Sequence, residues 1–265
     1  LDSSWHCPPF AAKNVLARYK LNYGALSSFL LLLLSIARYL GTDFLGVVPW
    51  SMWWTMVIVP LLYPGFFFLF RYLLYDKETA SPGAMDDLSG IATTLGLARI
   101  YRAQRKKRPR NIRLLLVAFG AEEAGLRGSR AFIRRHRDDL LAGDVWVLNV
   151  DGVADRNDFL CMEGEAWQMV RYDREYVDMV EGVMKEMGLG YHRWTMDAGG
   201  TDAAEFAKAG IARAITVSAQ DRTPGSNYHT RYDTLDRMDP EAMKLMNELC
   251  MRIVSQIDAK SAGNQ

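Results

Sequence analysis

The sequence predicts an α/β fold with three layers, in which helices cover both faces of a mostly parallel, mixed central sheet. From about residue 80 onward, short apolar runs typical of buried strands alternate with segments whose apolar residues recur at helical spacing. Strands that alternate with helices favour a largely parallel sheet buried on both faces. A second, strongly apolar segment precedes this domain. It covers residues 21–75 and predicts an inserted hydrophobic helical hairpin.

Residues 21–75 are predicted to form a two-helix membrane hairpin. Residues 23–37 carry no charge, and a second uncharged run extends from Phe44 to Phe70. A helix rises about 1.5 Å per residue, so the second run is long enough to cross an apolar core of about 30 Å. Trp50, Trp53 and Trp54 lie near its start, where an interfacial aromatic belt is expected. The alternative is a hairpin that is buried in protein or lies in the membrane interface.

The remaining residues, 76–265, are predicted to form the α/β domain. Helical spacing predicts helices over residues 87–104, 129–138 and 240–257, and a further helix within residues 165–187 that ends before Gly188. Short apolar runs predict buried strands over residues 112–119, 145–150 and 212–218. The order of these segments is the alternation that predicts the layered fold.

Composition excludes several classes of function. The chain has 265 residues, 49% of them hydrophobic, and a formal net charge of +1. This supports one sizeable core and gives no electrostatic reason to expect a nucleic-acid partner. We interpret the basic run from Arg102 to Arg110 as a solvated connector. Three widely spaced cysteines indicate neither a disulfide framework nor a cysteine-based zinc site.

Acidic residues and one histidine follow the predicted strands. Glu122 and Glu123 come directly after the run 112–119, and Asp151 comes after the run 145–150. Asp86 precedes the first helix, and His229 follows the third strand. Taken singly, each has an ordinary explanation as a helix cap or a turn residue. Together they place carboxylates and one imidazole at one sheet edge, a donor set suited to Zn²⁺ or a similar divalent ion.

Five motifs occur in a family-specific order: GAMDDLSG, VAFGAEEAGLRGS, LNVDG, GGTDAAEFAKAGI and YHTRYDT. This order resembles the co-catalytic di-zinc aminopeptidase family, peptidase family M28, whose relatives include glutamate carboxypeptidases and glutaminyl cyclases. The resemblance covers about residues 81–258 and implies a zinc-exopeptidase-like fold. It also implies two zinc ions per chain in the complete protein.

The resemblance assigns a role to each motif residue. Asp86 would bridge the two zinc ions, Glu123 and His229 would complete the ligands of one ion, and Asp151 would bind the other. Glu122 would be the general base, and Tyr228 would donate a hydrogen bond to the oxyanion. Thr201 and Asp202 would line the substrate pocket.

The family's His-x-Asp motif is incomplete in this chain. Asp2 matches its aspartate, so the matching histidine is expected one residue before Leu1, and residues 1–20 would be the end of a truncated N-terminal part of the peptidase domain. Asp2 and Asp86 must then meet at one site although residues 21–75 lie between them. This requires an even number of membrane crossings. Lys and Arg residues that flank the hairpin predict a cytoplasmic catalytic domain on a multi-pass membrane protein.

The leading interpretation is a membrane-anchored, metal-dependent exopeptidase, an aminopeptidase that releases N-terminal residues. Its expected partners are a peptide or small amide substrate and a lipid bilayer contacted through residues 21–75, with no nucleic acid. One alternative keeps the metals but acts as a carboxypeptidase, another amidohydrolase or a glutaminyl cyclase. The other alternative is a receptor-like homologue that has lost catalysis.

Overall fold

The structure is a computed structural model, and it describes residues 16–44, 62, 80–197, 199–220 and 227–263. The chain divides into two compact units. One contains residues 80–222 and 227–265 together with residues 1–4, and the other contains residues 5–79 and 223–226. The predicted catalytic residue Asp2 and the tryptophans of the predicted aromatic belt lie outside the described residues.

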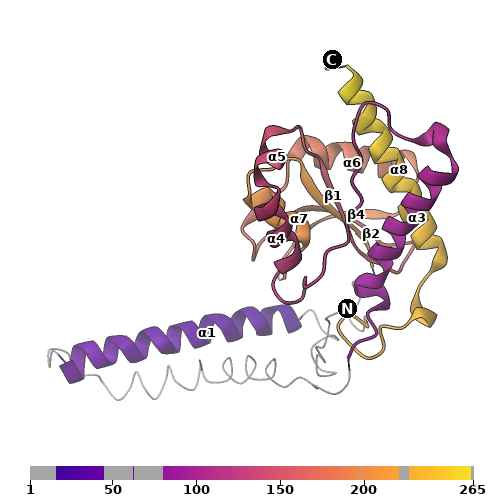
Figure 1. The fold of residues 1–265 in the computed structure, drawn as a ribbon. Coiled ribbons are helices and arrows are strands. Elements are labelled where there is room, and N and C mark those ends of the chain that lie inside the picture. Colours follow the sequence, from indigo (N-terminus) through magenta and orange to yellow (C-terminus); the bar gives the residue numbers. More distant parts are fainter. Residues whose placement is uncertain (1–15, 45–61, 63–79, 198, 221–226, 264–265) are drawn as a thin grey trace. The chain divides into compact units, whose positions relative to one another are not determined.

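A five-stranded mixed sheet forms the centre of the larger unit (Figure 1). Its strands are β1 (Val147–Val153), β2 (Phe159–Glu165), β3 (Val170–Arg171), β4 (Tyr191–Met196) and β5 (Ala214–Ala219). The strand order is β1-β5-β2-β3, and β4 pairs with the other edge of β2. The β1–β5 and β2–β4 pairs are parallel, whereas β2 runs antiparallel to β5 and β3. The mixed sheet is therefore confirmed, with fewer parallel pairs than the sequence predicts.

Helices cover both faces of this sheet, as Figure 1 shows. One layer contains α3 (Ser89–Ala103), α6 (Arg174–Glu186) and α8 (Pro240–Ala262), which pack on one another and on the sheet. The other contains α4 (Arg127–Arg135), α5 (Arg137–Ala142) and α7 (Asp202–Lys208). Short turns Arg105–Lys107 and Leu235–Arg237 are 3₁₀ helices. The three-layer α/β architecture is confirmed.

The hydrophobic core lies where β2 and β5 meet α6 and α8. Every residue of β5 is buried, as expected for a central strand with helices on both faces. The inward face of α8 is also buried, and it includes Met246, Leu249 and Ile253. Cys161 and Cys250 are buried free thiols within this core.

Most predicted elements are found near their predicted positions. The helix within residues 165–187 begins only at Arg174, after Asp173 accepts a hydrogen bond from the backbone N–H of Tyr176 at 2.8 Å as the N-cap. The predicted helix 129–138 is divided at His136, whose φ of −113° and ψ of 18° are not helical. The strands β2 and β4 were not predicted, because Glu163 and Arg193 interrupt their apolar runs. The helix α7, with seven residues, is too short to show a clear helical period.

The predicted strand 112–119 is wrong as a strand, because within the described residues this segment joins no ladder. Leu115, Leu116 and Val117 are also partly exposed, at 55%, 38% and 36%. An apolar run indicates a tendency to be buried, but a strand also needs a neighbour that completes its backbone hydrogen bonds. The sequence of the run carries no information about that neighbour.

The second unit is described through one long helix. The helix α1 (Leu16–Arg38) continues into a π-helical turn, Tyr39–Phe44. Among the described residues, no helix is both long and apolar enough to cross a membrane. The inserted membrane hairpin is therefore not supported, since Lys20 and Arg38 bound the uncharged part of α1, whereas a crossing needs about 20 apolar residues. Most of the second predicted span, Phe44 to Phe70, lies outside the described residues.

Candidate metal centre

Three chain segments, distant in sequence, bring Asp86, Glu123 and His229 together. Asp86 lies in the π-helical turn Ala84–Leu88, immediately before α3. Glu123 lies in a tight turn before α4, which is closed by hydrogen bonds from Gly125 N and Leu126 N to Glu122 O at 2.9 and 2.7 Å. His229 follows β5 in a turn where its φ is 55°, a left-handed conformation. The three predicted ligands on different segments thus meet at one place.

His229 Nε2 is in contact with both carboxylates. It lies 2.8 Å from Asp86 Oδ2 and 2.7 Å from Glu123 Oε1. Ligand atoms from all three residues lie within 4.8 Å of one another. Burial by itself lowers the pKa of His229, but the two carboxylates outweigh burial and raise this pKa to about 10.

The donor set fits a divalent metal ion. In the described part of the chain, Asp86 Oδ2 and His229 Nε2 are buried and make no well-aligned hydrogen bond, despite their short separation. Buried polar atoms normally have a partner, so these two atoms need another explanation. Two carboxylates and one imidazole are ligands that Zn²⁺ accepts, and an ion among them would satisfy both atoms.

Glu122 and Asp151 are two further carboxyl groups in the same region. Burial raises the pKa of Glu122 to about 8, with contributions from the charges of Glu123, Asp202 and Asp86. Burial also raises the pKa of Asp151 well above its usual value, and the nearby charges of Asp87, Asp86 and Glu122 act in the same direction. Several carboxylates that oppose one another's ionisation are a typical environment for a bound cation.

Asp87 is the second aspartate of the first motif and a site residue to which the motifs assign no role. Its Oδ1 accepts hydrogen bonds from Gly90 N at 2.9 Å and Gly152 N at 3.1 Å, which joins the start of α3 to β1 beside Asp151. Burial raises the pKa of Asp87 to about 7 despite these two bonds. Gly90 permits this close approach, because a Cβ there would lie 2.5 Å from Val150 O. The sequence feature that could have indicated a role for Asp87 is its position directly after Asp86 in the first motif.

Asp233 is a second residue that was missed, and it supports Asp86 directly. Its side chain is buried and accepts hydrogen bonds from Met85 N at 2.7 Å and Asp86 N at 3.1 Å. Both carboxylate oxygens are therefore used to fix the backbone of the turn that carries Asp86. The sequence contains Asp233 within the last motif, but its spacing gives no indication of this contact.

Replacing Asp233 with Asn is expected to weaken metal binding by about 10- to 100-fold, as is typical for groups that orient metal ligands. The Asn amide nitrogen would face a backbone N–H, and Asp86 would lose part of its support. Chelator competition measures the effect. Asp236→Asn, three residues along the chain in the short helix Leu235–Arg237, is the control and should leave metal affinity unchanged. An unchanged affinity in Asp233→Asn would contradict this role.

Tyr228 stacks on His229, with ring centroids 3.8 Å apart and an angle of 20° between the planes. The side chain is 44% exposed, but burial around its hydroxyl raises the pKa well above the usual value, and the charges of Asp86 and Glu123 add to this effect. The phenol is therefore protonated at neutral pH and can donate a hydrogen bond.

Thr201 and Asp202 lie at the start of α7 but face different surroundings. Thr201 has no exposed surface, and its hydroxyl donates to Glu165 at 2.6 Å, which argues against direct contact with a substrate. Asp202 is 8% exposed, and its charge raises the pKa of both Glu122 and Asp151. Asp202 therefore belongs to the metal region, whereas Thr201 lies beneath it.

Residues 75–254, more than half of the chain, match the sequence profile of peptidase family M28. The chain belongs to peptidase family M28. This M28 chain is 26% identical over 187 residues to aminopeptidase YwaD of Bacillus subtilis, a match that covers 66% of this chain and 38% of YwaD. It is 31% identical over 167 residues to a vacuolar membrane protease of Schizophyllum commune, a match that covers 62% of this chain and 17% of that protease.

Its fold is similar to that of BSAP, a zinc aminopeptidase from Bacillus subtilis, with a TM-score of 0.55 at 22% identity. The match covers 67% of this M28 chain and 43% of BSAP. The chain thus spans less than half of the length of each of these three relatives.

Proposed function

We propose that this protein is a zinc-dependent aminopeptidase that hydrolyses the first peptide bond of its substrate. The observation that carries the proposal is the cluster of Asp86, Glu123 and His229, with two buried ligand atoms that lack an aligned hydrogen bond. Membership of family M28 and the similarity to aminopeptidase YwaD support the same reaction. Bound zinc supplies Lewis acidity, which lowers the pKa of a water molecule and polarises the substrate carbonyl.

The residues around the cluster have separate roles in this proposal. Asp86 would hold both ions, Glu123 and His229 would hold one of them, and Asp151 would hold the other. Glu122 takes the proton from the attacking water as the general base. The Tyr228 hydroxyl, protonated at neutral pH, donates a hydrogen bond to the oxygen on which negative charge develops. Asp202 contributes charge beside Glu122.

The experiment compares aminoacyl-anilides with the same anilides carrying an N-acetyl group, using the full-length zinc-loaded protein. We expect release of aniline from the free-amine substrates and little from the blocked ones. Cleavage of blocked substrates or of C-terminal residues would favour the carboxypeptidase or amidohydrolase alternative, and cyclisation of glutaminyl peptides would favour a cyclase. Tight zinc binding without turnover of any of these substrates would favour the receptor-like alternative.

We also propose that residues 21–75 attach the protein to a membrane, with the catalytic domain on the cytoplasmic side. In α1 the apolar side chains Leu26, Phe29 and Leu32 are more than half exposed, and one relative is a vacuolar membrane protease. Carbonate washing of membranes, followed by protease treatment of sealed vesicles, tests both parts. Recovery of the protein in the soluble fraction would contradict attachment, and protection of the catalytic domain inside right-side-out vesicles would support the cytoplasmic side.

A further inference from the structure

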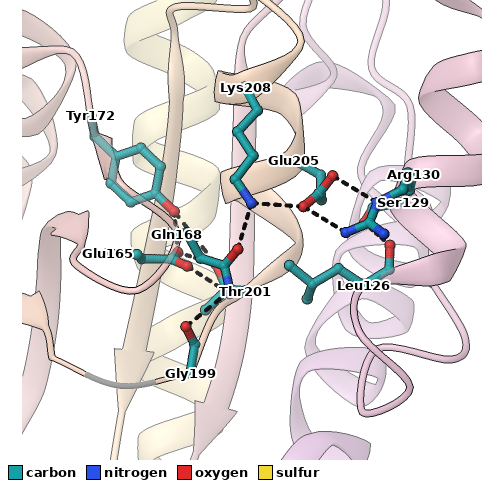
Figure 2. Close-up of polar contacts among 10 residues, drawn as sticks. All are labelled: Leu126, Ser129, Arg130, Glu165, Gln168, Tyr172, Gly199, Thr201, Glu205 and Lys208. Atoms are coloured by element: carbon teal, nitrogen blue, oxygen red, sulfur yellow. Dashed lines mark hydrogen bonds and ion pairs between the residues drawn. The ribbon is translucent and has the colours of Figure 1, made fainter. Parts of the chain in front are cut away.

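Glu165, the last residue of β2, is a carboxylate with no exposed surface. One of its oxygens accepts a hydrogen bond from Thr201 N at 2.8 Å, and the other accepts bonds from Thr201 Oγ1 at 2.6 Å and from the Tyr172 hydroxyl (Figure 2). A buried carboxylate is costly unless its hydrogen bonds are made. Here both oxygens are used, and two of the three bonds go to Thr201.

The two bonds to Thr201 fix the start of α7. Thr201 is the N-cap residue of this helix, where a threonine hydroxyl normally accepts a hydrogen bond from an N–H of its own helix. Thr201 makes no such cap, and its hydroxyl is instead oriented toward Glu165, to which it donates. The orientation of Thr201 is therefore set by β2 rather than by the helix it begins.

The same network reaches the strand that carries Asp151. Thr201 Oγ1 lies 2.6 Å from Thr216 Oγ1 on β5, and Asn149 Nδ2 on β1 donates to Thr216 Oγ1 at 3.4 Å. Asn149 precedes Asp151 by two residues on β1, and the β1–β5 register shifts between Val150 and Val153. Glu165 is thus connected, through Thr201 and Thr216, to the strand that carries a predicted metal ligand.

Side-chain hydrogen bonds also connect α7 to α4, the helix that follows the turn with Glu122 and Glu123. Arg130 on α4, which follows that turn, makes paired bonds to Glu205 on α7 at 3.0 and 3.1 Å (Figure 2). Lys208 Nζ lies 2.9 Å from Glu205 Oε1. Glu165 bonds to Thr201, the N-cap of α7, and Arg130 bonds to the middle of the helix. These contacts hold Asp202, the first residue of α7, beside the metal region.

We propose that Glu165 is a positioning residue of the metal centre, which acts by holding Thr201 and thereby fixes Asp202 at the start of α7 and joins α7, through Thr216 and Asn149, to the strand that carries Asp151. The proposal rests on the proposed function for the identity of the site, and it extends that function to a residue that touches neither metal nor substrate. Tyr172 donates to the same carboxylate, and its hydroxyl also lies 3.5 Å from Thr201 Oγ1 and 3.4 Å from Thr216 Oγ1, so it offers a comparison within the same network.

The test measures zinc affinity by chelator competition and the visible spectrum of the Co²⁺-substituted protein. In Glu165→Gln one carboxylate oxygen becomes an amide nitrogen, which cannot accept a hydrogen bond, so the side chain can no longer accept both bonds from Thr201. Thr201→Val removes the hydroxyl at nearly constant side-chain volume. We expect each variant to weaken zinc binding by about 10-fold, the lower end of the range for outer-shell partners, and to shift the Co²⁺ spectrum. Thr201→Ser keeps the hydroxyl and should restore wild-type affinity.

Tyr172→Phe separates positioning from stability. It removes the bond to Glu165 and the long contacts of this hydroxyl with Thr201 and Thr216, but it leaves both Glu165–Thr201 bonds in place. We therefore expect a lower unfolding temperature with unchanged zinc affinity. If Glu165→Gln and Thr201→Val also lower the unfolding temperature of the metal-free protein but leave zinc affinity and the Co²⁺ spectrum unchanged, Glu165 is only structural and the proposal is wrong. A wild-type protein that binds zinc without cleaving aminoacyl-anilides contradicts the proposed function alone, because the affinity measurements remain valid.

Discussion

Glu122→Gln is expected to lower kcat by about 10²- to 10⁴-fold, the usual contribution of a general base, while metal binding is retained. Glu122 is buried among Glu123, Asp202 and Asp86 but is not a member of the group that could hold the ion. Glutamine keeps the size of the side chain and cannot accept the proton. Steady-state hydrolysis of an aminoacyl-anilide, with zinc content measured on the same sample, gives the result.

The control for this variant is Glu186→Gln, at the exposed C-terminal end of α6. It should leave both kcat and zinc content at wild-type values. A Glu122→Gln protein with full zinc content and near wild-type kcat would show that another group removes the proton. Loss of zinc together with activity would instead move Glu122 into the ligand set.

His229→Asn is expected to weaken metal binding by more than the 10- to 100-fold typical of outer-shell changes, because it removes a ligand outright. Asparagine suits this position, since it tolerates the left-handed φ of 55° better than most residues. The control is His192→Asn, whose side chain is 57% exposed and lies 3.6 Å from Asp158. Equal zinc affinities in the two variants would remove His229 from the centre.

The role of His229 can also be tested in the metal-free protein, through the pH dependence of its unfolding free energy. The pKa of His229 is raised to about 10 in the folded protein, above an unfolded value of about 6.5. Its contribution to stability is therefore fully present below about pH 6.5 and is lost as the pH rises through about 10. The difference in unfolding free energy between metal-free wild type and His229→Asn should shrink over that range. A difference that grows with pH would contradict the ionic contact.

The sequence predicts the layered fold, and three side chains that the structure brings together, better than it predicts the sheet. A long periodic segment such as α8 is readily predicted as a helix, because one of its faces must be apolar over many turns. The metal-centre residues Asp86, Glu123 and His229 are recognisable because each follows or precedes an element within an ordered set of motifs. Strand pairing depends instead on neighbours distant in sequence. The antiparallel pairing of β2 with β5 was therefore not predicted, nor was the lack of a strand partner for the run 112–119 among the described residues.

Supporting residues were the hardest to predict, and the reason is physical. Asp233 and Glu165 act through hydrogen bonds to backbone N–H groups and hydroxyls, and any residue can supply the N–H. Their sequence contexts are therefore unremarkable, and only the folded arrangement shows what they contact. Asp87 is intermediate, because its place beside Asp86 indicated a polar role but not its bonds to Gly90 and Gly152.

The most direct test of the account is a crystal structure of the zinc-loaded full-length protein, with anomalous diffraction recorded above and below the zinc edge. We expect an anomalous peak in contact with Asp86 Oδ2, Glu123 Oε1 and His229 Nε2, the atoms that already lie together in the described structure. A second peak is expected beside Asp151. An active crystal form with zinc bound elsewhere, and none between Asp86, Glu123 and His229, would contradict the account.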